Sequence, residues 1–206
     1  CASLADVGLI CCGGGGGGQI EDDAEGSSLG VIKQLLTEMA GILPDRVLHL
    51  GGDETGTAAP CTLNNTKSFE QKVLQVALDL GKTPMGWEEM LSTTQAAAPV
   101  KQTIINTWLK TSWWEAAAAG HHVVDSLAPR FYLDIPFNQA SGMWTDLTQG
   151  HTNNTKLLLG GETSMWGDQY VFNCMEPATG QELFEQSIQS MVWPRAAVAA
   201  GSFYRV

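Results

Sequence analysis

Asp53 and Glu54 stand side by side directly behind an apolar run and two glycines, in the stretch HLGGDET at residues 49–55. Neighbouring carboxylates repel each other, and burying a carboxylate is costly unless it is paired or protonated. Such a placement indicates either a charged turn or a site that uses the two acids for chemistry. Because the glycines follow an apolar run, we expect them to let a buried strand turn sharply and present both acids at its end.

Seven tryptophans in 206 residues is a high count. An isolated tryptophan is more often a core residue, but tryptophans interleaved with carboxylates suit a carbohydrate. The CH face of a sugar stacks on an indole, while its hydroxyls donate hydrogen bonds to ionised acids. Four tryptophans occur at about one per predicted strand–helix unit: Trp87, Trp108, Trp144 and Trp166. For three others, which fall in predicted helices, we expect a packing role: Trp113, Trp114 and Trp193.

The composition restricts the partners of the chain. With 44% hydrophobic and 16% charged residues, its 206 residues suffice for one sizeable globular core or for part of a larger domain. A formal net charge of -11 at pH 7 disfavours a nucleic-acid backbone or an anionic membrane surface as partner. No apolar run approaches the roughly 20 residues of a membrane span. The opening residues CASLADVG lack the basic start and apolar stretch of a signal peptide.

Several short patterns bear on metal binding, glycosylation and local disorder. The five cysteines fit no zinc template, so we expect neither a metal nor a cofactor. Two N-x-T sequons, at Asn64 and Asn153, would permit glycosylation of a secreted protein. Six consecutive glycines precede the acidic run EDDAEGSS, without the Lys-Ser/Thr ending of a phosphate-binding loop. We therefore expect residues 1–28 to form an irregular or disordered segment ahead of the ordered domain over residues 29–206.

Hydrophobic periodicity predicts alternating helices and strands behind the glycine run. Apolar residues at helical spacing predict a helix over 29–42, which Pro44 stops, and a second helix over about 69–80, which Gly81 closes. The remaining predicted elements are strands at 46–50, 83–87, 103–108 and 156–166, extended chain at 121–126 and 130–134, and helices at 112–119 and about 180–200.

Alternating strands and helices at this spacing predict βα units and a parallel sheet. In a βα barrel, the active site is built from the carboxyl-terminal ends of successive strands. An open doubly wound sheet would instead gather its ligands at one switch point. We therefore predict an α/β fold of the (β/α)8 TIM-barrel type, because the candidate residues follow several strands: Asp53, Glu54, Trp87, Glu88, Trp108, Tyr132, Asp134 and Trp166.

The segments HLGGDE, GWEEM, FYLD, GGETSMWGDQ and WPRAA occur in this order. Together they resemble the catalytic barrel of family-20 glycoside hydrolases, the β-N-acetylhexosaminidases, over residues 29 to about 198. The resemblance implies removal of terminal non-reducing N-acetylhexosamine by substrate-assisted retaining hydrolysis, in which the substrate's own acetamido oxygen attacks the anomeric carbon. Glu54 would be the general acid and later the base, and Asp53 would hold the acetamido N–H.

The resemblance also implies roles for the other candidates. Three indoles would enclose the acetamido methyl group: Trp87, Trp108 and Trp166. Tyr132 would bind the acetamido oxygen, and sugar hydroxyls would be held by Asp134 and by Asp168, where many relatives have glutamate. Trp144 would line the same pocket, and two residues would have a supporting role: His49 and Glu162.

The family's strands before HLGGDE carry a substrate-binding arginine, an aspartate and a histidine that have no counterpart here. We therefore expect only the C-terminal part of the barrel, about strands four to eight. Two alternatives stay open: a catalytically impaired sugar-binding remnant, and a metal-dependent hydrolase using His49, Asp53, His121 and His122. The resemblance further implies glycans that contain N-acetylhexosamine as partners, a secreted, lysosomal or vacuolar location, and a homodimer as one allowed assembly.

Overall fold

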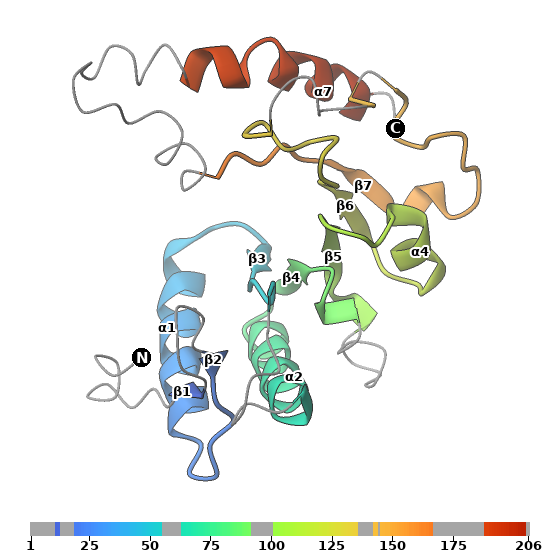
Figure 1. The fold of residues 1–206 in the computed structure, drawn as a ribbon. Coiled ribbons are helices and arrows are strands. Elements are labelled where there is room, and N and C mark those ends of the chain that lie inside the picture. Colours follow the sequence, from blue (N-terminus) through green and yellow to red (C-terminus); the bar gives the residue numbers. More distant parts are fainter. Residues whose placement is uncertain are drawn as a thin grey trace, which may run out of the picture. The chain divides into compact units, whose positions relative to one another are not determined.

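The computed structural model describes residues 11–12, 19–54, 63–91, 101–135, 142–143, 145–166 and 188–204 (Figure 1). The elements, in chain order, are β1 (Cys11–Cys12), β2 (Gln19–Ile20), α1 (Ser27–Ile42), β3 (Val47–His49), α2 (Leu63–Asp79), β4 (Thr83–Trp87), β5 (Ile104–Thr107), α4 (Trp113–Ala118), β6 (Val123–Asp125), the 3-10 helix η3 (Thr155–Leu157), β7 (Leu158–Gly161) and α7 (Arg195–Phe203).

Five strands form one sheet in the order β3-β4-β5-β6-β7, and the short β1 and β2 form a separate antiparallel pair. β3 and β4 run parallel, with Val47 opposite Thr83, and β6 and β7 are likewise parallel. A parallel pair needs a crossover connection, and here α2 connects β3 to β4. Consecutive strand order with helical connections confirms the predicted fold class, a part of a (β/α) barrel.

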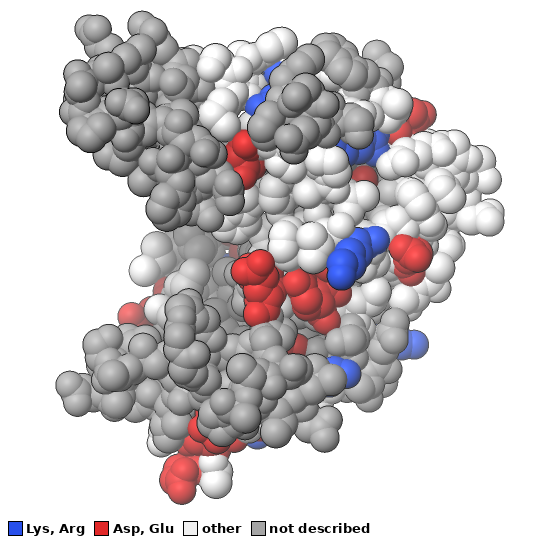
Figure 2. All heavy atoms as spheres, in the orientation of Figure 1, with Lys and Arg blue, Asp and Glu red and all other residues white. Residues whose placement is uncertain are grey.

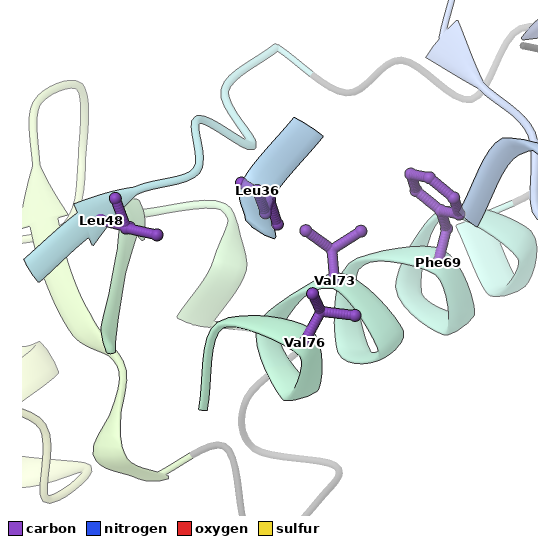
Figure 3. Packing of buried hydrophobic residues seen from close by; sticks show 5 residues of the cluster. All are labelled: Leu36, Leu48, Phe69, Val73 and Val76. Atoms are coloured by element: carbon purple, nitrogen blue, oxygen red, sulfur yellow. The ribbon is translucent and has the colours of Figure 1, made fainter. Parts of the chain in front are cut away.

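The chain divides into two compact units between Ile105 and Asn106, inside β5. In the first unit, α1, β3 and α2 enclose a hydrophobic cluster, whose side chains point toward one another in Figure 3. Three of its members lie on one face of α2, because a spacing of three or four residues returns to the same side of a helix. The cluster consists of Leu36, Leu48, Phe69, Val73 and Val76.

Two adjacent acids connect the start of α1 to the neighbouring helix. Asp23 accepts hydrogen bonds from the N–H groups of Ser27 (2.7 Å) and Ser28 (2.8 Å), which lie in the first turn of α1. Asp22 pairs with Lys72 on α2 at 2.7 Å and accepts a hydrogen bond from Ser68 at 2.6 Å. Burial raises the pKa of Asp22, but the hydrogen bonds from Lys72 and Ser68 outweigh it and hold this pKa below its usual value.

The second unit packs α4 and α7 against β6 and β7. Trp113 on α4 is fully buried and donates from Nε1 to the carbonyl of Leu147 at 3.1 Å, which confirms its predicted packing role. At the end of α7, the Phe203 ring packs edge-on against Phe131 with centroids 5.1 Å apart. This helix approaches β7 closely, because a Cβ at Gly161 would clash with the Phe203 ring.

Several predicted elements differ in detail. The strand expected at 156–166 is shorter, because residues 155–157 form η3 and β7 ends at Gly161. In the extended chain at 130–134, only Tyr132 makes a bridge, to Ser164. The last helix is interrupted at Trp193 and Pro194, since proline cannot donate to the helical ladder, and it continues to Phe203. Trp193 is 54% exposed, so its predicted packing role was wrong.

Three further predictions concern the burial of the strand at 46–50, the start of the last helix and the boundary at residue 28. The strand expected to be buried at 46–50 is β3, of which Leu48 alone is buried. The part of the last predicted helix before residue 188 lies outside the described residues. The boundary expected at residue 28 stays a prediction; within the described part, residues 19–28 include β2 and the first two residues of α1.

Gly161→Ala is expected to lower the free energy of unfolding by about 1–3 kcal/mol, because the added methyl meets the Asp125 carbonyl at 2.7 Å as well as the Phe203 ring. The matched control is Gly30→Ala, whose methyl would meet nothing within 4 Å and whose position inside α1 favours alanine. We expect it to raise stability by about 0.5–1 kcal/mol. Urea unfolding of both variants tests the packing of α7 on β7; equal stabilisation by both would contradict it.

Candidate active site

The chain turns at the end of β3 through two glycines in left-handed conformations. Gly51 has a φ of 75° and Gly52 a φ of 91°, values that residues with a Cβ rarely adopt. A Cβ at Gly52 would also come within 2.6 Å of the Met90 side chain. The glycines therefore permit the sharp turn, as predicted, and also its close packing on Met90. Glu54 itself has a φ of 50°, a conformation that is uncommon for non-glycine residues and is concentrated at functional sites.

Hydrogen bonds attach this turn to β4 and to the residues behind it. The N–H of Leu50 donates to the Met85 carbonyl at 2.8 Å, and the N–H of Trp87 donates to the Gly51 carbonyl at 2.9 Å. The backbone N–H of Glu54 donates to the Glu89 carboxylate at 3.1 Å. The backbone that carries the two acids is thus held from β4, with the Asp53 side chain half-buried and the Glu54 side chain exposed.

His49 lies against Trp87 at the ends of β3 and β4. Their ring centroids are 4.9 Å apart at an interplanar angle of 62°. His49 Nδ1 accepts a hydrogen bond from the Gly51 N–H at 3.2 Å, so the side chain folds back on the turn. Because His49 is exposed, it is not a core histidine of the strand. The first unit therefore brings the HLGGDE turn, His49 and Trp87 together.

A cavity of about 200 Å³ lies beneath this turn in the first unit. Gly52 and Met90 contribute to its wall, whereas neither Asp53 nor Glu54 does. The wall is largely apolar, with polar side chains contributed by Thr66 and Glu70. Its lining residues are Ile20, Leu50, Gly52, Thr66, Phe69, Glu70, Val73 and Met90.

In the second unit, Trp108 and Tyr132 stack at the ends of successive segments. Their ring centroids are 6.3 Å apart and their planes are nearly parallel, at 20°. Trp108 directly follows β5 and is half-buried, while Tyr132 is buried and bridges to Ser164. Asp134 follows two residues later and is half-buried. The ring contact therefore joins the residue after β5 to the segment that carries Asp134.

Glu162 belongs to a hydrogen-bond network that joins the ends of β5, β6 and β7. The Asn106 amide donates to Glu162 Oε1 at 2.7 Å, and the Ser126 hydroxyl donates to Asn106 Oδ1 at 2.7 Å. Both Asn106 and Ser126 are buried. Neither these two residues nor Glu89 was predicted as part of the site. The polar Asn106, directly after two isoleucines of β5, was the signal that could have identified the network.

A buried ion pair supports the second unit. The Arg130 guanidinium lies 3.8 Å from Asp125, and both side chains are buried. Burial raises the pKa of Asp125, against the opposing effects of the Leu127 N–H and of Arg130, and burial also lowers the pKa of Arg130. Arg130 further donates to three backbone carbonyls, those of Gly142, Thr145 and Asp146. The pair therefore organises the loop around residues 142–146.

The remaining candidates are placed only in part. Trp166 is 42% exposed, and Trp144 and Asp168 lie outside the described residues.

Among the described residues, no three His, Cys, Asp or Glu side chains cluster in a way that could hold a metal ion. No described helix is long and apolar enough to cross a membrane. On the visible face in Figure 2, acidic side chains occur in several places and basic ones in small patches.

The consecutive strand order, with parallel pairing at β3–β4 and β6–β7, defines the class of the fold, part of a (β/α) barrel. The model of glycosyl hydrolase family 20, catalytic domain, matches residues 19–204. The chain therefore belongs to this family.

Known relatives agree with this assignment. The chain is 29% identical to beta-hexosaminidase 1 of Arabidopsis thaliana, over 87% of this chain and 34% of that protein. It is 26% identical to human beta-hexosaminidase subunit beta, over 78% of this chain and 30% of that protein. The solved family-20 β-N-acetylhexosaminidase of Streptomyces coelicolor superposes with a TM-score of 0.65 at 21% identity, over 88% of this chain and 37% of that one. The chain thus spans about a third of the length of these relatives.

Proposed function

We propose that the chain acts as a β-N-acetylhexosaminidase, which removes terminal non-reducing N-acetylhexosamine from glycans by substrate-assisted retaining hydrolysis. The observation that carries the proposal is the complete HLGGDE motif within the family match, with Asp53 and Glu54 on a positive-φ turn at the end of β3. Relatives named beta-hexosaminidases support the substrate class. We also propose secretion or a lysosomal or vacuolar location, which the family resemblance implies.

In this proposal the two neighbouring acids divide the work. Glu54 donates a proton to the leaving oxygen, and it later removes a proton from the attacking water. Asp53 accepts a hydrogen bond from the acetamido N–H, which orients the acetamido oxygen toward the anomeric carbon. The bond from that oxygen to the anomeric carbon forms as the glycosidic bond breaks, and the Asp53 carboxylate stabilises the positive charge of the resulting oxazolinium ion. Water then opens this ring with net retention.

The remaining residues would bind the sugar. The stacked pair of Trp108 and Tyr132 supplies an aromatic wall and a phenolic donor for the acetamido group. Trp87 and Trp166 would complete the enclosure of its methyl group, and hydroxyls would bind Asp134 and Asp168. Trp144 would line the same pocket. His49 and Glu162 would support these groups, His49 through its contact with Trp87 and Glu162 through Asn106.

The first test compares substrates that differ only in the acetamido group. The chain is expected to release 4-nitrophenol from the N-acetyl-β-glucosaminide at least about 10³-fold faster than from the corresponding β-glucoside, because the glucoside lacks the internal nucleophile. NMR of the first sugar released should show the β-anomer. Comparable rates on both substrates, or an α-anomer, would contradict the mechanism.

A second candidate function is that of a sugar-binding remnant without turnover, since Trp108 and Tyr132 stack in the second unit whereas Asp53 and Glu54 belong to the first. A remnant would bind N-acetylglucosamine saturably and would hydrolyse neither substrate. Isothermal titration with N-acetylglucosamine, run beside the hydrolysis assay, separates the two functions. The proposal of an enzyme fails if binding is measured without turnover.

A further inference from the structure

Arg195, in the WPRAA segment, has no part in the proposed chemistry, yet it is only 5% exposed. It begins α7, and its guanidinium donates to three backbone carbonyls. Nη1 reaches the carbonyl of Ile135 at 2.7 Å, and Nη2 reaches those of Leu133 and Met191, the latter at 2.9 Å. Nε also donates to Met191, at 3.1 Å. A single side chain therefore connects α7 to residues 133–135.

The two remote carbonyls flank Asp134. Arg195 is 60 residues from Ile135 and 62 residues from Leu133 along the chain, so these contacts are tertiary. On its other side, the segment 131–135 is held by Ser164: Leu133 N–H donates to the Ser164 carbonyl at 2.7 Å, and Ser164 N–H donates to Phe131 at 3.1 Å. No described strand includes residues 131–135. Their backbone is therefore held by the bridge to Ser164, by the bond from the Phe131 N–H to the Leu127 carbonyl at 3.0 Å and by Arg195.

Only arginine has the shape for these contacts. Its planar guanidinium carries five donors in a fixed fork, so it can hold two carbonyls that face the same plane. Hydrogen bonds from a charged donor are shorter and stronger than neutral ones. Burial lowers the pKa of Arg195, while the negative charge of Asp134 opposes that effect. The same guanidinium thus acts on Asp134 through its charge and through the carbonyls on either side.

The contacts of Arg195 are not needed merely to attach α7. At its other end, the helix is held by the Ser202 hydroxyl, which donates to the Met143 carbonyl at 2.9 Å, and by the packing of Phe203 on Phe131. Ala199, one turn after Arg195, is fully buried as well. The helix therefore has its own anchors, and Arg195 adds an attachment at the segment that carries Tyr132 and Asp134.

We propose that Arg195 is a positioning residue that sets the backbone of residues 131–135, so that Tyr132 and Asp134 are placed to bind the N-acetylhexosamine. The inference rests on the proposed function. It adds a determinant of sugar affinity that does not itself touch the sugar.

The experiment compares Arg195→Met with Ala199→Gly in the full chain. Both changes weaken α7, but only the first removes the donors to Leu133 and Ile135. Arg195→Met is expected to raise KM for the N-acetyl-β-glucosaminide and the dissociation constant of N-acetylglucosamine by about 10-fold or more. Amide hydrogen exchange of residues 131–135 is expected to accelerate. Ala199→Gly should lower the unfolding midpoint and leave KM and this exchange close to wild type.

Arg195→Lys keeps the charge but can reach fewer carbonyls, so we expect an intermediate KM. It also serves as the test if the methionine variant does not fold. Equal KM changes in Arg195→Lys and Ala199→Gly, or unchanged exchange at residues 131–135, would overturn the inference while leaving the proposed function intact. If the wild-type chain neither binds N-acetylglucosamine nor hydrolyses its glycoside, the proposed function fails, and the positioning role fails with it.

Discussion

Glu54→Gln is expected to lower kcat for an N-acetyl-β-glucosaminide with a poor leaving group by about 10²- to 10⁴-fold, the usual contribution of a general acid. The change keeps the size of the side chain and the backbone N–H that donates to Glu89, so the turn should be preserved. The measurement is initial-rate hydrolysis of a natural disaccharide substrate, whose alcohol leaving group must be protonated to depart. The role given to Glu54 would be refuted if the variant kept its activity.

Substrates with different leaving groups distinguish loss of proton donation by Glu54 from a general loss of active protein. A 2,4-dinitrophenyl glycoside needs little protonation to depart, so Glu54→Gln should recover much of the rate of its first step, seen as a burst of dinitrophenol. Glu38→Gln, at an exposed position of α1, makes the same chemical change away from the turn and should match wild type on every substrate. A loss of similar size on both leaving groups would argue against proton donation by Glu54.

Asp53→Asn is expected to lower kcat/KM by about 10²- to 10³-fold, in the range found when one group that stabilises transition-state charge is removed. The amide still occupies the half-buried position of Asp53, but it loses the negative charge that faces the oxazolinium ion. In contrast to Glu54→Gln, this loss should persist with the 2,4-dinitrophenyl glycoside, because a better leaving group does not orient the acetamido oxygen.

Asp45→Asn is the matched control for this change, since Asp45 is exposed ahead of β3. It should leave kcat/KM unchanged, and circular dichroism should show the same unfolding curve for wild type and control. If the better leaving group restored the rate of Asp53→Asn, Asp53 rather than Glu54 would be the general acid. That result would contradict the roles proposed for the two acids.

The features that depend on local sequence were predictable. Helical spacing identified α1, α2 and α4, and apolar runs identified β3, β4 and β5, because these patterns reflect which face of each element is buried. The glycine turn behind β3 was also predictable, since residues with a Cβ rarely adopt the positive φ of Gly51 and Gly52. The ends of elements were not predictable in the same way. The apolar run at 156–166 predicts one strand, but it contains part of η3 and the shorter strand β7.

The partners of the candidate side chains could not be predicted, because they come from distant parts of the chain. Glu89 lies 35 residues from Glu54, and Asn106 lies 56 residues from Glu162. Periodicity indicates which side of a strand faces inward, but it does not say which side chain of another strand lies opposite. The packing expected of Trp193 was wrong for a related reason, since Pro194 interrupts the helix there and leaves the indole exposed.

The acids ahead of α1 bear on how a shorter version of this protein should be designed. A chain that began at residue 29, where the regular periodicity starts, would lack Asp22 and Asp23. It would lose the partner of Lys72 and the acceptors for the first N–H groups of α1 together. A chain that began at residue 19 would retain them, and with them the whole of the segment that matches the family. Residue 19 is therefore the better start for expression and crystallisation.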